Sequence, residues 1–378
     1  MMMGIGTLCL ALAGGPARAS GQEAIHEALD IIEQRYGDRV DADALWQAAT
    51  AGVAAGLDIQ LGLTGSAILD ASQYADSQRW AEGHRQGIGV EFSIAAGQGL
   101  LITDVFEGGP ADAVGVRPRD LVVGMDGHPF IGQPAPVIHA VVAQASGPQV
   151  ILEVHREGDR IRRLEVDRGP YDISAVRSQP VSSGVLLVRI PFFGSGTARS
   201  LAEALATLPD DGSAVVLDLR ENVGGQVHEA VAAADLFLPE GAVILQLEGP
   251  GGQRTLKTAS GRRSFNGSVV ALMNQGTRGA AEAFLASLHG HGVGKLVGTR
   301  TAGEAAVPSY HPIGTNLMLR IPEYTMLDPV GVSWRGRGID PDIVVEPVRS
   351  KLPSAPGSMP PDLQRDAAVQ LIAPAGLD

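Results

Sequence analysis

Residues 268–290 form a pattern of apolar strand, glycine-bearing turn and helix, SVVALMNQGTRGAAEAFLASLHG. The run Ser268–Met273 has the length and composition of a buried strand, and apolar residues recur at helical spacing from Phe284 to Leu288. Hydrolases place a nucleophile on such a turn, because the helix N-terminus offers free N–H groups to a developing oxyanion. The turn contains neither serine nor cysteine. The pattern therefore predicts the frame of a hydrolase site without its nucleophile.

A second turn of this kind follows the apolar strand SAVVLDLR and opens the helix QVHEAVAAADLFL. Its glycines, Gly224 and Gly225, stand where backbone N–H groups can cradle a negatively charged oxygen. The structural alternative is a tight strand-to-helix connection in which Asp218 and Arg220 form an ion pair. The sequence alone leaves both interpretations open.

Residues 171–348 alternate strands and helices around these two turns. Further strands read GVLLVRI, VILQL and KLVGTR, and SGTARSLAEALATL is an amphipathic helix with Ser195 as its candidate N-cap. This alternation predicts an α/β core, a sheet with covering helices.

Residues 87–170 differ from the α/β pattern of residues 171–348, because they contain short strands separated by turn signals. GIGVEFSI and LLITDVF read as strands, GGPADAVGV as a short helix, RDLVVGMDGHPF as a hairpin, and QVILEVHREG with IRRLEVD as a closing strand pair. This order resembles a PDZ domain, in which a loop presents backbone N–H groups to the terminal carboxylate of a peptide. The resemblance assigns that loop to Gly87, Ile88, Gly89 and Val90. The alternative is that these glycines only shape a turn in a structural module.

The two ends of the chain carry other signals. Residues 1–19 resemble a signal peptide with the small-x-small pattern Ala17-Arg18-Ala19, which predicts export to the periplasm or the cell exterior. The alternative is a mis-assigned start codon. Residues 20–86 predict a helical segment, and residues 349–378 predict a flexible tail because proline and serine are frequent at its start.

Composition and motifs disfavour several function classes. The formal net charge of −13 disfavours nucleic-acid binding, and no apolar run after the N-terminal segment reaches transmembrane length. The only cysteine, Cys9, lies in that segment, so the mature chain needs no disulfide. No Walker loop, G-x-S-x-G or H-E-x-x-H occurs, and we interpret His289 and His291 as a surface pair. We therefore expect neither a cofactor nor a metal.

Together the segments resemble the C-terminal processing peptidases, also called tail-specific proteases, which are tricorn-like serine peptidases with a PDZ domain. The matching segments LDLRENVGGQVHEAVAAADLFLP, MNQGTRGAAEAF, LVGTRTAGE and GRGIDPDIVVEP run in the family's order. The resemblance covers nearly the whole mature chain. It implies a protease-like α/β core, with an inserted PDZ-like domain that follows an N-terminal helical segment.

The active-site positions depart from that family. Its members carry Ser-Ala-Ser-Ala-Ser-Glu or Thr-Ala-Ser-Ala-Ala-Glu after the strand, with the third residue as nucleophile, and here that position is Gly279. The base of the Ser-Lys members is a lysine 25 residues later, which corresponds to Glu304. The supporting glutamine, four residues further, corresponds to Pro308. Glycine cannot attack a carbonyl, and a glutamate cannot replace a lysine that burial tunes to accept a proton.

The resemblance therefore implies a pseudoprotease. A vestigial oxyanion hole would remain, formed by Gly224 or Gly225 with the N–H of Ala280. Such a protein would bind unstructured C-terminal tails of proteins or peptides as an adaptor, inhibitor or assembly factor, and a homo-oligomer is left open. Two alternatives also stay open. One is an active serine-type endopeptidase with a non-standard nucleophile, such as Thr277, or a site completed by a partner. The other is a binder of apolar small molecules.

Overall fold

The computed structural model describes residues 21–36, 39–61, 65–95, 97–156, 160–173, 176–209, 213–347 and 361–372. The described chain divides into two compact units. The first takes the residues up to Leu69 together with Tyr310–Ile321, and the second takes the rest. The expected signal peptide lies outside the described residues. Within the described ranges, no helix combines the length and apolarity that a bilayer crossing needs.

The first unit contains the helices expected near the N-terminus. They are α1 (Gly21–Tyr36) and α2 (Ala42–Leu61), followed by strand β1 (Ala67–Asp70). Few side chains of this unit are buried, and Leu29 and Ala54 are the buried apolar ones in the described part of the two helices. Helix α3 (Ala71–Glu82), which begins the second unit, has a capping box between Asp70 and Gln73.

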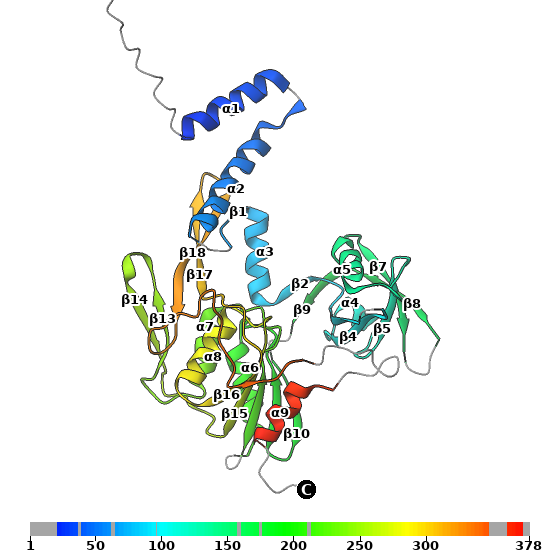
Figure 1. Cartoon of the computed structure of the whole chain (residues 1–378), viewed down its shortest axis with the longest axis vertical. Helices are drawn as coiled ribbons and strands as arrows, with labels where there is room; N and C mark the ends of the chain where they lie inside the picture. Colours follow the sequence, from blue (N-terminus) through cyan, green and yellow to red (C-terminus); the bar gives the residue numbers. More distant parts are fainter. Residues whose placement is uncertain are drawn as a thin grey trace, which may run out of the picture. The chain divides into compact units, whose positions relative to one another are not determined.

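A six-stranded sheet forms the centre of the second unit (Figure 1). Its strands, in spatial order, are β10 (Arg177–Ser182), β11 (Val185–Arg189), β12 (Ala214–Asp218), β15 (Ser268–Met273), β16 (Gly294–Gly298) and β19 (Ile343–Val344). In this sheet β11, β12, β15, β16 and β19 are parallel to one another. Strand β10 lies at the edge and is antiparallel to β11. The α/β core expected from the sequence is therefore present.

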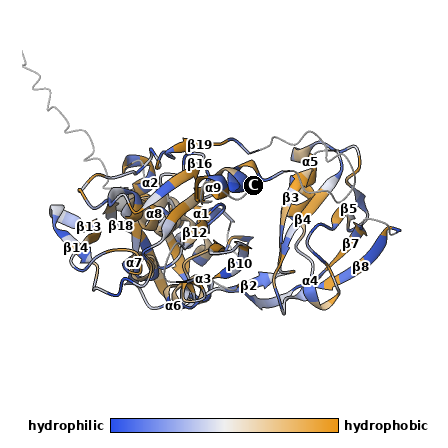
Figure 2. Ribbon diagram, turned by 90° about the horizontal axis from the view of Figure 1, so that it is seen from below, coloured by the Kyte–Doolittle hydropathy of each residue, from blue (hydrophilic) through white to orange (hydrophobic). Residues whose placement is uncertain are grey.

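Helices cover both faces of this sheet. Alternate residues such as Val215 and Leu217 pack under α6 (Thr197–Leu205), α7 (Val227–Asp235) and α8 (Ala280–Gly290). Residues of the opposite parity, such as Val216, pack against α9 (Leu363–Ile372). Figure 2 shows the resulting concentration of apolar residues in α8 and the strands beside it. Because both faces are covered, these strands read as continuous apolar runs.

A second sheet, which is antiparallel, borders the core. Strand β13 (Val243–Glu248) pairs with β14 (Arg254–Thr258) across a short 3₁₀ turn, Pro250–Gly252. On its other side β13 pairs with the last residues of β18 (Leu317–Leu327). Strand β17 (Ala306–Ile313) pairs with β18.

Residues 84–172 build a separate sheet of the second unit, hereafter the inserted module. A ribbon of β2 (His84–Gly87) and β9 (Gly169–Asp172) joins it to the neighbouring segments. The sheet runs β3 (Val90–Ala95), β4 (Gly99–Val105), β5 (Leu121–Met125), β7 (Gln149–His155) and β8 (Arg162–Asp167), with β6 (His128–Pro129) on β5. Helices α4 (Pro110–Ala113) and α5 (Ala135–Gln144) complete it. The expected strands and short helix are present, whereas α5 was not expected.

Two expectations need correction. Part of the expected flexible tail is helix α9, whose Ala368 is fully buried against the sheet and whose Gln364 donates to the Val345 carbonyl at 2.7 Å. Ser195 does not cap α6. That helix begins after Gly196, whose φ is 82°, and the carboxylate of Glu229 accepts the N–H groups of Gly196 and Ala198 at 2.8 and 3.0 Å.

Candidate active site

Gly279 lies on a sharp turn between the carboxyl end of β15 and the first residue of α8. Its backbone angles, φ 58° and ψ −120°, are strained for any residue with a side chain. A strained strand-to-helix turn is the geometry that exposes a nucleophile in hydrolases. A Cβ added here would meet only the Cα of Gly224, at 3.7 Å, so the position is open in space. The turn thus combines strained backbone angles with open space, and glycine occupies it.

Hydrogen bonds join this turn to the loop that follows β12. The side-chain oxygen of Asn274 accepts the Glu221 N–H at 3.0 Å, and its side-chain amide donates to the Glu221 carboxylate at 2.8 Å. The N–H of Arg278 donates to the Asn222 carbonyl at 3.0 Å. The two loops therefore meet at the carboxyl ends of neighbouring parallel strands, where ligands bind in α/β sheets.

Thr277 is fully buried within this junction. Its hydroxyl donates to the Leu219 carbonyl at 2.8 Å and accepts the N–H of Asn274 at 3.0 Å. A hydroxyl with both bonds inside the protein has no free direction toward a substrate. Thr277 therefore fixes the turn and is not placed as a substitute nucleophile.

The two glycines after β12 differ in their bonding. The N–H of Gly224 donates to the Asn222 side chain at 2.9 Å, so the expectation that Gly224 supplies an oxyanion-hole donor is corrected. The absence of a Cβ lets Gly224 approach Arg278 and Ala280, which a Cβ would meet at 3.2 and 3.4 Å. Among the described residues, we find no hydrogen bond from the N–H of Gly225 or of Ala280. The prediction of a vestigial oxyanion hole therefore rests on these two groups.

Glu304 lies beside the turn and forms an ion pair with Arg278. The Arg278 guanidinium is 3.0 Å from the Glu304 carboxylate, and the two side chains are 41% and 47% exposed. Arg278 stands where the resemblance expects a small alanine, and Glu304 where it expects the lysine base. The two departures from the family therefore contact each other and place a charge pair beside the nucleophile position.

Glu282, three residues after Gly279, is a buried carboxylate with four hydrogen-bond donors. It accepts the N–H groups of Gly279, Gly303 and Glu304 at 3.1, 2.7 and 2.8 Å, and the hydroxyl of Thr301. Burial raises the pKa of this carboxyl, and the four donors oppose that rise. The side chain thereby ties the nucleophile turn to residues 301–304, a role that the sequence analysis did not assign.

The remaining side chains considered near the site have other roles. Pro308 lies within β17 rather than in the 301–304 loop, at a position whose side chain is only partly buried. His289 approaches Asp342 at 3.4 Å, whereas His291 contacts the Val243 carbonyl at 2.8 Å. Both histidines are exposed and have different partners. Among the described residues, no acidic, histidine or cysteine side chains cluster as a metal site would require.

Asp218 and Arg220 form the structural ion pair that the sequence left as an alternative. Their closest approach is 2.7 Å, and Arg220 also binds Asp362, just before α9, at 2.7 Å. Burial opposes the charge on Arg220, but the hydrogen bonds with both carboxylates outweigh it and raise the pKa of the guanidinium. The pair therefore fixes the end of β12 and attaches α9.

The module loop 87–90 opens onto an apolar cavity of about 150 Å³. The carbonyls of Ile88 and Gly89 accept the N–H groups of Ala111 and Phe106 at 2.8 and 3.0 Å, which fixes the loop. Within the described residues, the N–H groups of Ile88 and Gly89 donate to no acceptor that we find. Apolar side chains from β3, β4, β5, β7 and α5 line the cavity: Val90, Phe92, Leu100, Ile102, Val122, Met125, Val142, Val150 and Leu152.

Comparison with known proteins identifies the core. Residues 184–345 match the family model of Peptidase family S41. This part of the chain is therefore similar to peptidase family S41. The carboxy-terminal processing protease CtpA of Bacillus subtilis is 28% identical over 333 residues, which cover 87% of this chain and 70% of that protein.

Other relatives agree with this family assignment. A protein of Staphylococcus aureus (strain COL), named "Probable CtpA-like serine protease", is 26% identical over 85% of this chain and 64% of its own length. The solved structure of the photosystem II D1 C-terminal processing protease covers 85% of this chain and 92% of its own, with 22% identity and a TM-score of 0.54. That structure supports the fold, a protease-like mixed α/β core.

Proposed function

We propose that this protein is an exported pseudoprotease that binds unstructured protein C-termini without cleaving them. The observation that carries the proposal is Gly279, which occupies the strained turn at the start of α8 where a nucleophile would stand. The nearest hydroxyl in the turn, that of Thr277, is engaged within the protein. In subtilisin, loss of the nucleophile lowers kcat by about 10⁶.

The pair Arg278–Glu304 supports the same conclusion. A general base must accept the hydroxyl proton of the nucleophile, and a lysine does so when burial lowers its pKa. Glu304 is about half exposed and its carboxylate is engaged by a guanidinium. Neither partner of a Ser-Lys dyad is therefore available at these positions.

The inserted module is proposed to be a PDZ domain that holds the client's terminus. Support comes from the loop 87–90, whose φ values of 152° at Gly87 and 75° at Gly89 favour glycine. Two N–H groups of this loop have no acceptor among the residues that the structure describes, and they lie beside an apolar cavity between β3 and α5. A cavity of about 150 Å³ is large enough for a benzene-sized group, so it fits one apolar terminal side chain. A bound peptide would then extend β3 as an added strand.

The test is calorimetry of the full chain with a peptide ending in valine, as free acid and as C-terminal amide. We expect the amide to bind about tenfold or more weakly, since charge-assisted bonds to a carboxylate contribute about 1.5–3 kcal/mol. Val142→Asp on the cavity wall should abolish binding. Val137→Asp, on the same helix but 44% exposed and away from the cavity, should not. Equal affinity for the two peptides would refute carboxylate capture.

The second candidate function is peptidase activity, which the names of the relatives favour. It would require a nucleophile outside the matched position, or one that a partner supplies. Cleavage of the bound peptide distinguishes it from the proposed binding function.

A further inference from the structure

Three hollows of the second unit share lining residues and therefore adjoin one another. The first is the cavity at the loop 88–90, and it shares Val90 and Phe92 with a second hollow of about 1120 Å³. The second shares Gln179 and Leu187 with a third of about 480 Å³. The three hollows thus lie in a row, hereafter the trough, from the module loop to helix α9.

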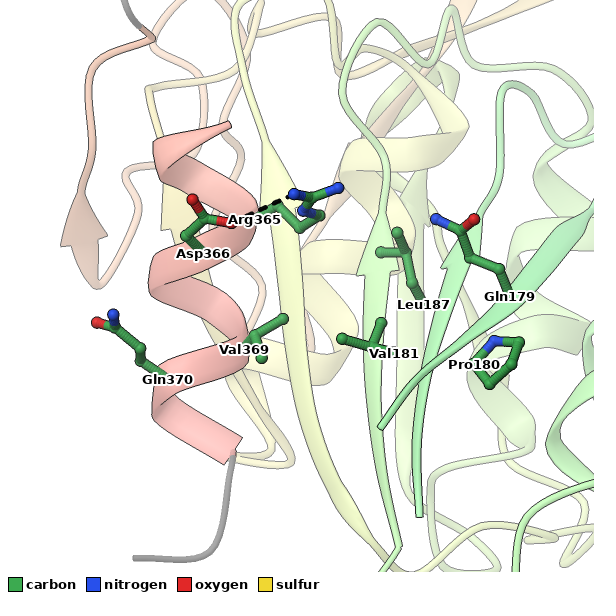
Figure 3. A pocket seen from close by; sticks show the side chains of 8 residues that line it. All are labelled: Gln179, Pro180, Val181, Leu187, Arg365, Asp366, Val369 and Gln370. Atoms are coloured by element: carbon green, nitrogen blue, oxygen red, sulfur yellow. Dashed lines mark hydrogen bonds and ion pairs between the residues drawn. The ribbon is translucent and has the colours of Figure 1, made fainter. Parts of the chain in front are cut away.

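The third hollow is a groove between β10 and α9 (Figure 3). Its floor is apolar: Val181 and Leu187 of the strands and Val369 of the helix face the same space. Its rim is polar and carries Gln179 and Gln370 from opposite sides. An apolar floor with a polar rim suits a single aliphatic side chain carried on a hydrated backbone.

Strand β10 bounds the groove and ends its sheet. Five of its six residues are exposed, and Val181 itself is 39% exposed. Pro180 and the register shift between Pro180 and Ser182 interrupt the free edge, and such features protect an edge strand from pairing with another chain. A ligand in this groove is therefore held by side-chain contacts rather than by a new ladder of backbone bonds.

The middle of the trough passes the candidate active site. Its lining includes Glu221, Val223 and Asn274, which belong to the two loops that meet at the nucleophile turn. It also includes the ion pair Arg189–Glu91, at 2.6 Å, between the core and β3. A chain in the trough would pass polar and charged side chains here and reach apolar surface at both ends.

We propose that the groove between β10 and α9 is a second peptide subsite. It binds an apolar side chain of a client whose C-terminus is held at the loop 87–90, so the inference rests on the proposed function. The occupant is the unfolded segment immediately upstream of that terminus, because the row of hollows begins at the terminal cavity and the first two of them share Val90 and Phe92 of β3. An extended chain advances about 3.3 Å per residue, so a pentapeptide of about 17 Å does not reach beyond the six residues of β3.

The experiment compares three free-acid peptides by calorimetry with the full chain. One is a pentapeptide ending in valine. The second is a 20-residue peptide with the same last five residues and leucine at every third upstream position. The third has serine in place of those leucines. We expect the leucine peptide to bind about tenfold tighter than the other two, as the burial of one aliphatic side chain predicts.

Two variants on β10 test whether the groove causes the tighter binding of the leucine peptide. Val181→Asp puts a charge into the groove and should remove the tenfold gain while leaving the pentapeptide affinity unchanged. Ser182→Asp is the matched control on the same exposed strand outside the groove, and it should keep the gain. A gain that survives Val181→Asp, or the absence of any gain, overturns the subsite. If the pentapeptide does not bind, that result counts against the proposed function. The subsite is then tested by the affinity of the leucine peptide alone, which Val181→Asp should lower and Ser182→Asp should leave unchanged.

Discussion

Replacing Glu282 by alanine is expected to lower the free energy of unfolding by about 3 kcal/mol or more. The carboxylate accepts four donors from Gly279, Thr301, Gly303 and Glu304 in a fully buried place. Each buried donor left without an acceptor costs about 1–3 kcal/mol, and relief of the buried charge offsets part of that loss. Urea denaturation followed by tryptophan fluorescence measures the change.

Glu304→Ala is the matched control, because it removes a second glutamate from the same site. Its ion pair with Arg278 is about half exposed, and exposed pairs contribute about 0–1 kcal/mol. We therefore expect a change below about 1 kcal/mol for this variant. If the two variants were equally stable, Glu282 would not hold the turn and the 301–304 loop together.

Restoring four family residues is expected to create a reactive serine. The changes are Gly279→Ser, Glu304→Lys, Arg278→Ala and Pro308→Gln. The space for a side chain at Gly279 exists, although the strained turn should cost about 1–3 kcal/mol of stability with any residue other than glycine. Arg278→Ala removes a cation that would otherwise lower the pKa of the new lysine further. Labelling with a serine-reactive phosphonate, located by mass spectrometry, measures the result.

Two controls accompany this four-site variant. Gly279→Ser alone should stay unlabelled, because a serine without a base is a weak nucleophile near neutral pH. Gly279→Ala combined with the other three changes should also stay unlabelled. A folded four-site variant without an adduct at position 279 would mean that the cleft has diverged beyond these positions.

The core of the fold could be predicted because its strands are buried on both faces. β11, β12, β15 and β16 are therefore short apolar runs, and the turns after β12 and β15 carry glycines. α3 lies inside residues 20–86, which were predicted as one helical segment, and its capping pair, Asp70 and Gln73, is a local signal for its start. α5 was missed although Ile138, Val141 and Val142 recur at helical spacing, and its valines and isoleucine have low intrinsic helix propensity. Most residues of β18 are half-buried, so its sequence lacks the alternation of apolar and polar residues that predicts a strand.

The candidate site was predictable in its positions but not in its long-range contacts. The spacing of Gly279 and Glu304 could be read from two motifs, and the structure places both at one turn through Arg278. The bond from the Gly224 N–H to the Asn222 side chain is a local contact between residues i and i+2, which the tendency of asparagine to form such turns could have suggested. The ion pair of Arg220 with Asp362 joins residues 142 positions apart, beyond the reach of local patterns. Contacts of this kind depend on tertiary packing.

The most direct test of the account is to incubate the purified chain with the 20-residue leucine peptide at a concentration where calorimetry shows binding, and to record the peptide mass over a day. The account predicts a bound peptide of unchanged mass. Specific cleavage would contradict it if the cleavage were lost in Thr277→Ala or Glu304→Ala and retained in Ser182→Asp.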